Sequence, residues 1–119
     1  LSHVMKGSSV PYFVTIGYGD RDGYDRTPLK VREEAHAHDA KLQKDGVLMG
    51  IAGKPVQVRN PGAIGVETVI GPFMSSALPV AGFAIIEAAT LDEAVEMASK
   101  APCAVAHGVV EVWPLVEAQ

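Results

Sequence analysis

Short runs of β-branched and aromatic residues recur along the chain, and each is too short to be a helix. Four of them are rich in Val, Ile, Phe or Tyr and are bounded by Gly or Pro, a pattern typical of buried strands. We predict strands at residues 11–17, 47–52, 82–88 and 109–113, with Pro114 ending the last one.

The segment between the first two strands predicts a helix. We expect Thr27 as its N-cap and Pro28 as its first residue, since the missing N–H of proline costs nothing there. Gly46 is expected at the C′ position, where a left-handed backbone closes many helices. Residues 18–26, which are crowded with Gly and Asp, are predicted to form an irregular loop.

A second helix is predicted before the last strand. Thr90 and Glu93 have the spacing of a capping box, in which each side chain pairs with a backbone N–H of the first turn. The helix should run to about Lys100 and stop before Pro102.

Residues 56–59 and 64–69 flank a Pro- and Gly-containing connection at residues 60–63, which indicates a hairpin. If the hairpin extends a sheet strand, the element order is that of the split βαβ unit. We therefore predict an α+β fold, a ferredoxin-like sandwich with an antiparallel sheet and both helices on one face.

Both faces of the predicted sheet are apolar. Val14 and Ile16 alternate with Phe13 on the first strand, and Ile85 alternates with Ile86 further along. A sheet with one solvated face should alternate apolar and polar residues instead, and two helices cover only one face. We expect the second face to pack on another copy of the chain, in a homodimer or a higher assembly; the alternative is a loop folded over it.

Composition narrows the class of protein. The 119 residues fit one domain, 1–119, and 48% hydrophobic with 20% charged residues is typical of a globular chain. The formal net charge of −4 favours neither nucleic acid nor a membrane surface as a partner. Cys103 is the single cysteine, which excludes an intramolecular disulfide and suits the reducing cytoplasm. Residues 1–7 are interpreted as disordered or as partly added to the native chain, in which case residues 1–4 precede a native start at Met5.

Four short motifs in order resemble the YCII-related family, and more narrowly its DGPF-type branch. They are the GPF turn at Gly71–Phe73, the GF pair at Gly82–Phe83, the LDEA helix start at Leu91–Ala94 and the EVxP strand at Glu111–Pro114. The resemblance covers about residues 12–115. It implies a ferredoxin-like fold whose sheets pack face to face in a dimeric α+β barrel. It also implies a His–Asp pair in a cleft, and related proteins that act on ring-derived small molecules, including a dehydrochlorinase.

Two positions depart from the family pattern. The Asp that precedes GPF in the family is Ile70 here. The His that the family carries in its first helix falls on Ala35, with His36 and His38 close by. The pair that the resemblance implies is therefore displaced at one position and lost at the other.

Helical geometry separates the two histidines. Val31, Ala35, His38 and Leu42 share one stripe, whereas His36 lies about 100° from Ala35. We expect His38 to face the sheet and His36 to flank the stripe. His38 is our first candidate for a catalytic acid–base group and His36 the second, because imidazole exchanges protons near neutral pH. The alternative is an ordinary hydrogen-bonded core histidine.

A carboxylate must orient such an imidazole. Asp39 is excluded as the partner of His38 because adjacent residues diverge on a helix. Asp20 is our candidate catalytic partner and Asp22 a candidate ligand-binding residue. The alternative for both is that they only stabilise a turn, as Asp residues in loops often do.

Other polar groups are weaker candidates. Ser75 and Ser76 follow the GPF turn and could bind a ligand, or could belong to a polar loop. We expect no metal site, because His36 and His38 are two residues apart and point to different helix faces.

Two functions stay open. The first is a cofactor-free enzyme that moves a proton on a small molecule, as an isomerase or lyase, in a cleft between the first helix and the sheet. The second is a non-catalytic ligand-binding or accessory module of the same fold with a regulatory role.

Overall fold

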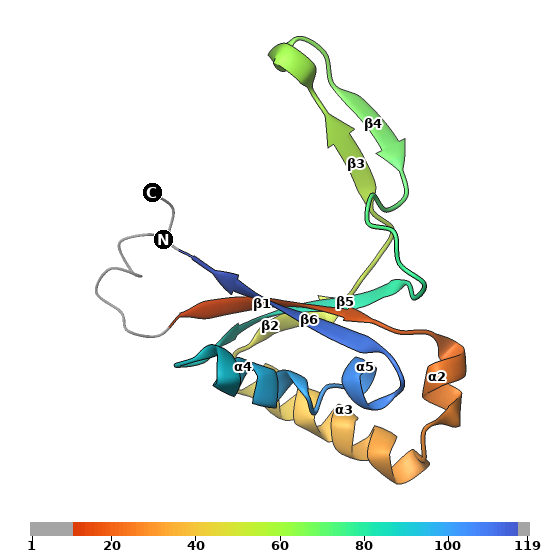
Figure 1. Cartoon of the computed structure of the whole chain (residues 1–119), viewed down its shortest axis with the longest axis vertical. Coiled ribbons are helices and arrows are strands. Elements are labelled where there is room, and N and C mark those ends of the chain that lie inside the picture. Colours follow the sequence, from red (N-terminus) through yellow and green to blue (C-terminus); the bar gives the residue numbers. More distant parts are fainter. Residues whose placement is uncertain (1–10, 117–119) are drawn as a thin grey trace.

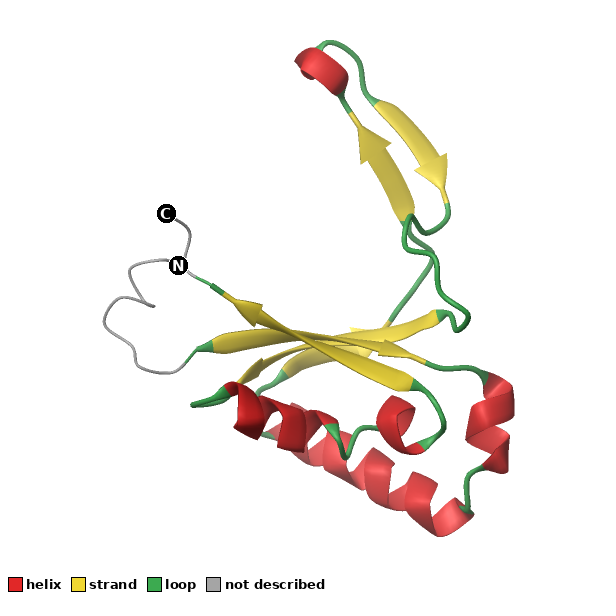
Figure 2. Cartoon of the chain, in the orientation of Figure 1, coloured by secondary structure: helices red, strands yellow, loops and turns green. Residues whose placement is uncertain are grey.

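The computed structural model describes residues 11–116, so the expectation for residues 1–7 lies outside the described part. A four-stranded antiparallel sheet carries helices on one face, and a separate hairpin stands on the other side (Figure 1, Figure 2). The main sheet consists of β1 (Tyr12–Tyr18), β2 (Leu48–Ile51), β5 (Val80–Glu87) and β6 (Val109–Leu115). The hairpin consists of β3 (Val56–Arg59), the 3-10 turn η1 (Pro61–Ala63) and β4 (Glu67–Ile70). The helices are α2 (Arg21–Arg26), α3 (Leu29–Lys44), α4 (Leu91–Ala98) and α5 (Pro102–Val105).

The strand order β2-β5-β1-β6 places β1 and β5 in the centre and β2 and β6 at the edges. All three neighbouring pairs are antiparallel. With the hairpin set aside, this is the order of the split βαβ unit, in which each helical segment crosses from one strand to a strand two places away. The predicted α+β, ferredoxin-like fold is confirmed.

The register assigns each strand residue to one face, because directly paired residues point to the same side. Phe13 pairs with Ile86, and both are 3% exposed beneath the helices. Ile16 pairs with Phe83 on the opposite side, where Phe83 is 47% exposed. The sheet is therefore apolar on both faces, as predicted, and among residues 11–116 of one chain helices cover only one of them.

The core lies between the sheet and α4. Phe13, Ile86, Ala88 and Ala94 form its buried cluster, and Met97 packs against it from the same helix. Burial of one side chain of the size of Phe13 stabilises the fold by about 1.5–3 kcal/mol, so this cluster anchors α4 to the two central strands.

The predicted irregular loop at residues 18–26 is wrong, because α2 occupies most of it. The carboxylate of Asp20 accepts the backbone N–H of Gly23 at 2.9 Å and caps the helix. Asp22 and Arg26 form an exposed ion pair at 3.1 Å one turn apart. This local pairing outweighs the low helix propensity of the Gly and Asp residues.

Thr27 is not the N-cap of α3, and this prediction is also wrong. Its hydroxyl donates to the carbonyl of Gly23 at 2.8 Å and thereby closes α2. Pro28 stands at the N-cap of α3, which begins at Leu29. Gly46 follows the other end of the helix with φ +97°, so the predicted glycine stop is confirmed.

The capping box of the second helix is confirmed. The Thr90 hydroxyl accepts the backbone N–H of Glu93 at 3.1 Å, and the Glu93 carboxylate accepts that of Ala89 at 3.3 Å. The helix ends at Ala98 rather than Lys100.

Two prolines behave differently from the prediction. Pro102 opens the additional helix α5, since proline is well suited to a first helical turn. Pro114 lies inside β6 instead of ending it. An edge strand tolerates proline because a backbone N–H on its free side has no partner to lose.

The predicted hairpin exists, but it does not extend the main sheet. β3 and β4 pair with each other, and Figure 1 shows them standing away from the face opposite the helices. β4 begins at Glu67 rather than at residue 64, because the connection forms a 3-10 turn in which Gly62 has φ +65°. Residues 56–70 are called the arm below.

Candidate functional site

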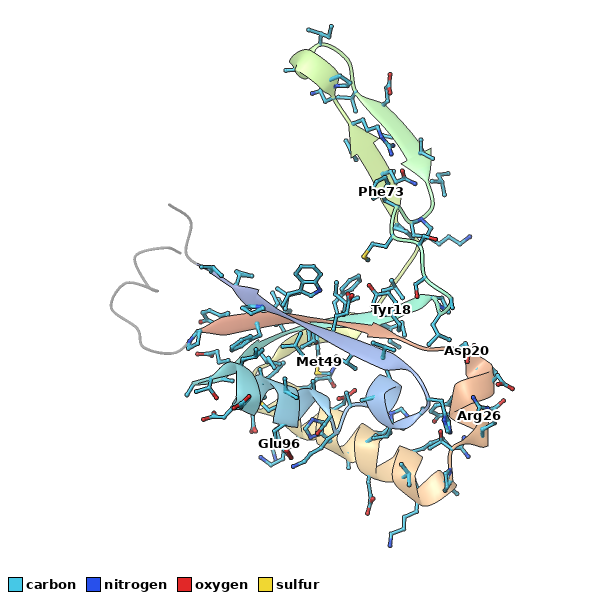
Figure 3. The ribbon with its side chains drawn as sticks, in the orientation of Figure 1. Tyr18, Asp20, Arg26, Met49, Phe73 and Glu96 are labelled. Atoms are coloured by element: carbon cyan, nitrogen blue, oxygen red, sulfur yellow. The ribbon has the colours of Figure 1, made fainter. Side chains whose placement is uncertain are left out.

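A cavity of about 590 Å³ lies between α3, α4, α5 and the helix-facing side of the sheet. Its walls are mostly apolar and include Met49, Ala84, Ile86 and Met97. Figure 3 shows Met49 pointing from the sheet toward the helices. Such a cavity matches the size and character of pockets that bind small molecules.

The cavity exists because small residues line the sheet beneath α3. Gly17 and Gly82 sit on its floor, and Ala35 is the buried residue of α3. A Cβ at Gly82 would lie 2.8 Å from the backbone oxygen of Gly50, so a larger residue there would push against β2. Small residues on the strands, together with a helix whose buried residue is an alanine, thus leave space between the sheet and α3.

Two ionisable residues of α3, His36 and Asp39, line the cavity. They are three residues apart, which puts them on the same helix face. His36 is exposed at the rim, and its Nε2 lies 2.9 Å from the phenol oxygen of Tyr24 on α2. The short helix α2 therefore holds the imidazole from the outside.

The Asp39 carboxyl is half-buried. Burial raises its pKa above the usual value, while the nearby imidazoles of His38 and His36 act in the opposite direction. Because burial is the larger effect, the carboxylate binds a proton more readily than an exposed aspartate does. A half-buried carboxyl and an imidazole thus both line the cavity wall.

Cys103 on α5 lines the cavity as well. Burial raises the pKa of its thiol, and the negative charge of Asp39 raises it further. A thiol with a raised pKa stays protonated at neutral pH and is a poor nucleophile. Cys103 thus contributes a protonated thiol to the cavity wall.

His38 lies on the inward stripe of α3 and is half-buried, with Nε2 buried and without a hydrogen-bond partner. Its neighbour His36, rather than His38, lines the cavity. Helical geometry predicts His38 to face the sheet, and His38 is indeed the more buried of the two side chains. It does not reveal that the cavity opens beside His36.

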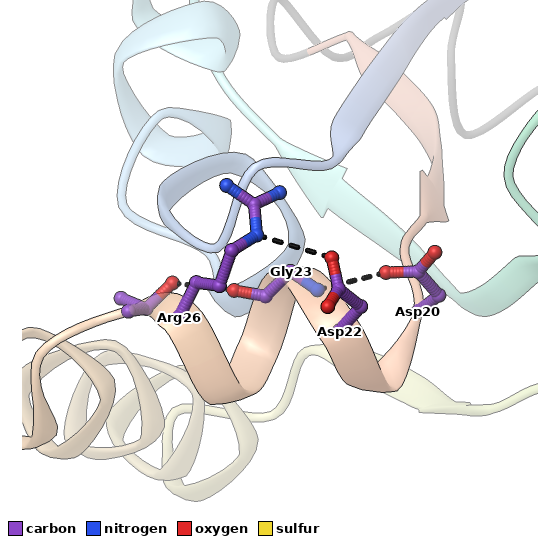
Figure 4. A network of polar contacts seen from close by, with 5 residues as sticks. Asp20, Asp22, Gly23 and Arg26 are labelled. Carbon is purple, nitrogen blue, oxygen red and sulfur yellow. Dashed lines mark hydrogen bonds and ion pairs between the residues drawn. The ribbon is translucent and has the colours of Figure 1, made fainter.

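Asp20 and Asp22 serve α2 (Figure 4). One carboxylate oxygen of Asp20 accepts the backbone N–H of Gly23. Asp20 also lines a second, more open pocket, and His36 and Cys103 belong to both this pocket and the main cavity. Asp22 is exposed and paired with Arg26. The structure brings neither carboxylate into a hydrogen bond with His36 or His38.

Ser75 and Ser76 are exposed in the segment after the arm. The Ser76 hydroxyl accepts the backbone N–H of Leu78 at 3.1 Å, which stabilises a turn. Neither serine lines the cavity.

The sequence reasoning missed three participants. Asp39 was considered only as a partner of the adjacent His38, although its spacing of three from His36 was a usable signal. Tyr24 was missed because its segment was expected to be irregular. Cys103 reaches the cavity through α5, which the sequence analysis did not predict.

Neither a metal cluster nor a membrane-spanning helix is found in the described residues. No group of three or more His, Cys, Asp or Glu side chains among residues 11–116 is arranged to hold a metal ion. Within the same range, no helix has the length and apolarity to cross a membrane.

Comparison with known proteins identifies the family. The model of the YCII-related domain matches residues 12–119, nearly the whole chain. No curated protein matches the sequence. The match spans every element of the sheet, the arm and the cavity, so this chain belongs to the YCII-related family.

Proposed function

We propose that the chain is a cofactor-free enzyme that moves a proton on a small, largely apolar molecule bound between α3 and the sheet. One observation carries the proposal: a carboxyl with a raised pKa and an imidazole share the wall of an apolar cavity. Perturbed acid–base groups in a concave apolar site are the usual mark of proton-transfer catalysis.

Asp39 suits the role of the base. A raised pKa makes its carboxylate a stronger proton acceptor, and the apolar surroundings strengthen its pull on an acidic C–H of a bound molecule. In an isomerisation the proton returns to another atom of the same molecule. In an elimination the C–H electrons form a double bond, and the leaving group departs with its own pair.

His36 suits the return of the proton. The Tyr24 phenol holds Nε2, which leaves Nδ1 free on the other side of the ring. With Asp39 three residues along the helix, one group can take a proton while the other gives one. Tyr24 acts here as a positioning residue.

The walls favour a compact ring over a charged or extended molecule. Thr15 and Gln43 are further polar residues at the cavity, so hydrogen-bonding partners are few and the remaining contact is apolar. Carbonyl-bearing or halogenated ring compounds have this balance of surfaces. A non-catalytic binding role is the second candidate, favoured by Ile70, which stands where the resemblance places an Asp and is 81% exposed on the arm.

Deuterium exchange tests proton transfer before a product is known. A panel of small ring lactones and chlorinated hydroxyquinols is incubated with the protein in D₂O, and loss of ligand C–H signals is followed by NMR. We expect exchange with the wild-type chain and at least a tenfold slower rate with Asp39→Asn. Binding without any exchange would favour the non-catalytic role, and perturbation of backbone signals only on the far side of the sheet would overturn the site.

We also propose that two copies pair through the face of the sheet that the helices leave bare. This open face is defined by residues of three strands that point away from the helices: Val14, Ile16, Phe83, Ile85, Trp113 and Leu115. Phe83, Trp113 and Leu115 are 47, 56 and 45% exposed. Water contact with so many neighbouring large apolar side chains is costly, so a second copy is the expected cover.

A further inference from the structure

The arm has one apolar face, and residues 11–116 of its own chain leave that face bare. Val56 pairs with Ile70 and Val58 with Thr68, so these four side chains point the same way. Val56, Val58 and Ile70 are 55, 66 and 81% exposed. An isolated two-stranded hairpin is marginally stable in water, and this one needs a cover for its apolar side.

The opposite face of the arm is polar and finds partners locally. The Gln57 amide donates to the backbone oxygens of Gly71 and Pro72 at 3.2 and 3.3 Å. The Arg59 guanidinium lies 5.7 Å from the centre of the Phe73 ring, at the lower part of the arm (Figure 3). Gln57 and Arg59 therefore find partners within the chain. Val69 is the one large apolar side chain on this face, and it is 49% exposed.

The open face of the sheet is a chemically matching surface. Glu111, a charged residue of this face on the edge strand β6, accepts hydrogen bonds on Oε1 from the Tyr18 phenol at 2.8 Å and from the Trp113 indole at 3.2 Å. The bond to Glu111 raises the pKa of the Tyr18 phenol, with further contributions from burial and from the carboxylate charge. The phenol thus stays a donor, and the carboxylate is already partnered when an apolar surface covers it.

A contact at the base of the arm relates it to this face. The Tyr18 phenol also lies 3.4 Å from the sulfur of Met74, which follows the arm in sequence. Figure 1 shows the arm rising from this region on the side of the open face. The arm therefore stands on the side of the sheet that carries the open face.

The area available suits a second copy. Seven large apolar side chains of the arm and of the open face are between 40 and 81% exposed. A standard interface needs roughly 800 Å² from each partner, and a surface of this many large exposed side chains is of that order. A two-fold axis brings the arm of each copy to the open face of the other, so both surfaces are buried at once. A partner of different shape would have to fit the face and the arm separately.

We propose that the arm docks its apolar face, Val56, Val58, Thr68 and Ile70, on the open face of a second copy. The inference rests on the pairing proposed above and adds to it a reciprocal exchange of arms. Each arm then holds the two copies together. Docking on the second copy also gives the hairpin the cover that an isolated two-stranded hairpin needs to be stable.

Cross-linking between two different chains tests the exchange. In a Cys103→Ser background, one chain carries Val58→Cys and the other carries Ile85→Cys, and the two chains differ in mass. After mixing and subunit exchange, a short bis-maleimide should join them into a heterodimer. The control replaces Val58→Cys with Val69→Cys, on the polar face of the same arm, and should give at least fivefold less product.

Each outcome of this experiment supports or overturns either the pairing of two copies or the exchange of arms. The expected heterodimer, strong with Val58→Cys and weak with Val69→Cys, supports arm exchange. A monomer by light scattering overturns both the pairing and the exchange. A dimer without the Val58–Ile85 product overturns the exchange alone. Cross-linking inside one chain that carries both cysteines, at monomer mass, would show instead that the arm folds onto its own sheet.

Discussion

Gly17 on β1 and Cys103 on α5 approach so closely that the strand position has room for glycine alone. A Cβ at Gly17 would lie 2.9 Å from the sulfur of Cys103 and 3.4 Å from its Cβ. The contact brings the first turn of α5 onto the sheet at the floor of the cavity. The size of both residues therefore sets the shape of the site.

Gly17→Ala should cost about 1–2 kcal/mol of unfolding free energy, because the added methyl group must displace the thiol or bend the strand. Urea denaturation of the purified variant measures the loss. The matched control is Gly50→Ala on β2, where nothing lies within 4 Å of the new Cβ. The control should stay within about 0.5 kcal/mol of the wild type.

A double variant shows whether the close contact is the cause. Cys103→Ala removes the nearest atom, so Gly17→Ala should cost much less in that background than in the wild type. Equal costs in both backgrounds would mean that the destabilisation arises from the strand itself and not from the thiol.

Asp39→Asn should make stability less sensitive to pH. The raised pKa means that the folded state binds a proton more readily than the unfolded chain. Wild-type stability should then fall as the pH rises from about 4, the ordinary aspartate value, through the raised folded pKa. Asn cannot ionise, so the variant should gain on the wild type over this window and keep a constant advantage above it.

Urea midpoints of both proteins across that pH range measure the effect. The gain should stay below about 1 kcal/mol, because the carboxyl is partly solvated. Asp45→Asn on the same helix is the control: Asp45 is exposed and paired with Lys41 at 3.2 Å, so its loss should bring no gain. A variant at position 39 that is less stable than the wild type at neutral pH would contradict burial as the dominant effect.

Tyr24→Phe tests whether α2 positions the imidazole. The change removes the hydroxyl that lies 2.9 Å from His36 and keeps the ring, over which the Arg32 guanidinium lies at 4.7 Å. Stability should change by less than about 1 kcal/mol, because the lost bond is exposed. Deuterium exchange of a bound compound should slow about threefold to tenfold while its dissociation constant is unchanged. Equal losses in binding and exchange would point to a structural role.

Much of the fold followed from the alternation of residues on the strands. Phe13 and Ile16 were correctly separated onto opposite faces of one strand, and Ile85 and Ile86 onto opposite faces of another, because strand geometry has a period of two. Which of the two faces the helices cover was not predicted. The same local logic predicted the Thr90–Glu93 capping box. These features depend on near neighbours in sequence.

What failed depends on contacts that sequence spacing does not reveal. The α2 segment looked irregular, yet a single Asp20 cap and the closing bond of Thr27 stabilise it. The cavity depends on the meeting of Gly17 with Cys103, which are far apart in the chain. A helical wheel ranked His38 above His36 because it reports which side faces inward. It contains no information on where the inner packing leaves space.

His38 provides the last prediction, because its Nε2 is buried without a partner on the inward stripe of α3. A buried polar atom that makes no hydrogen bond costs about 1–3 kcal/mol. His38→Leu removes that atom and keeps an apolar side chain beside Ala35, so the melting temperature should rise by several degrees. His36→Leu, on the exposed side of the same helix, should change it little. If His38→Leu melts lower than the wild type while His36→Leu does not, the buried nitrogen has a partner in solution, and His38 is an ordinary hydrogen-bonded core histidine.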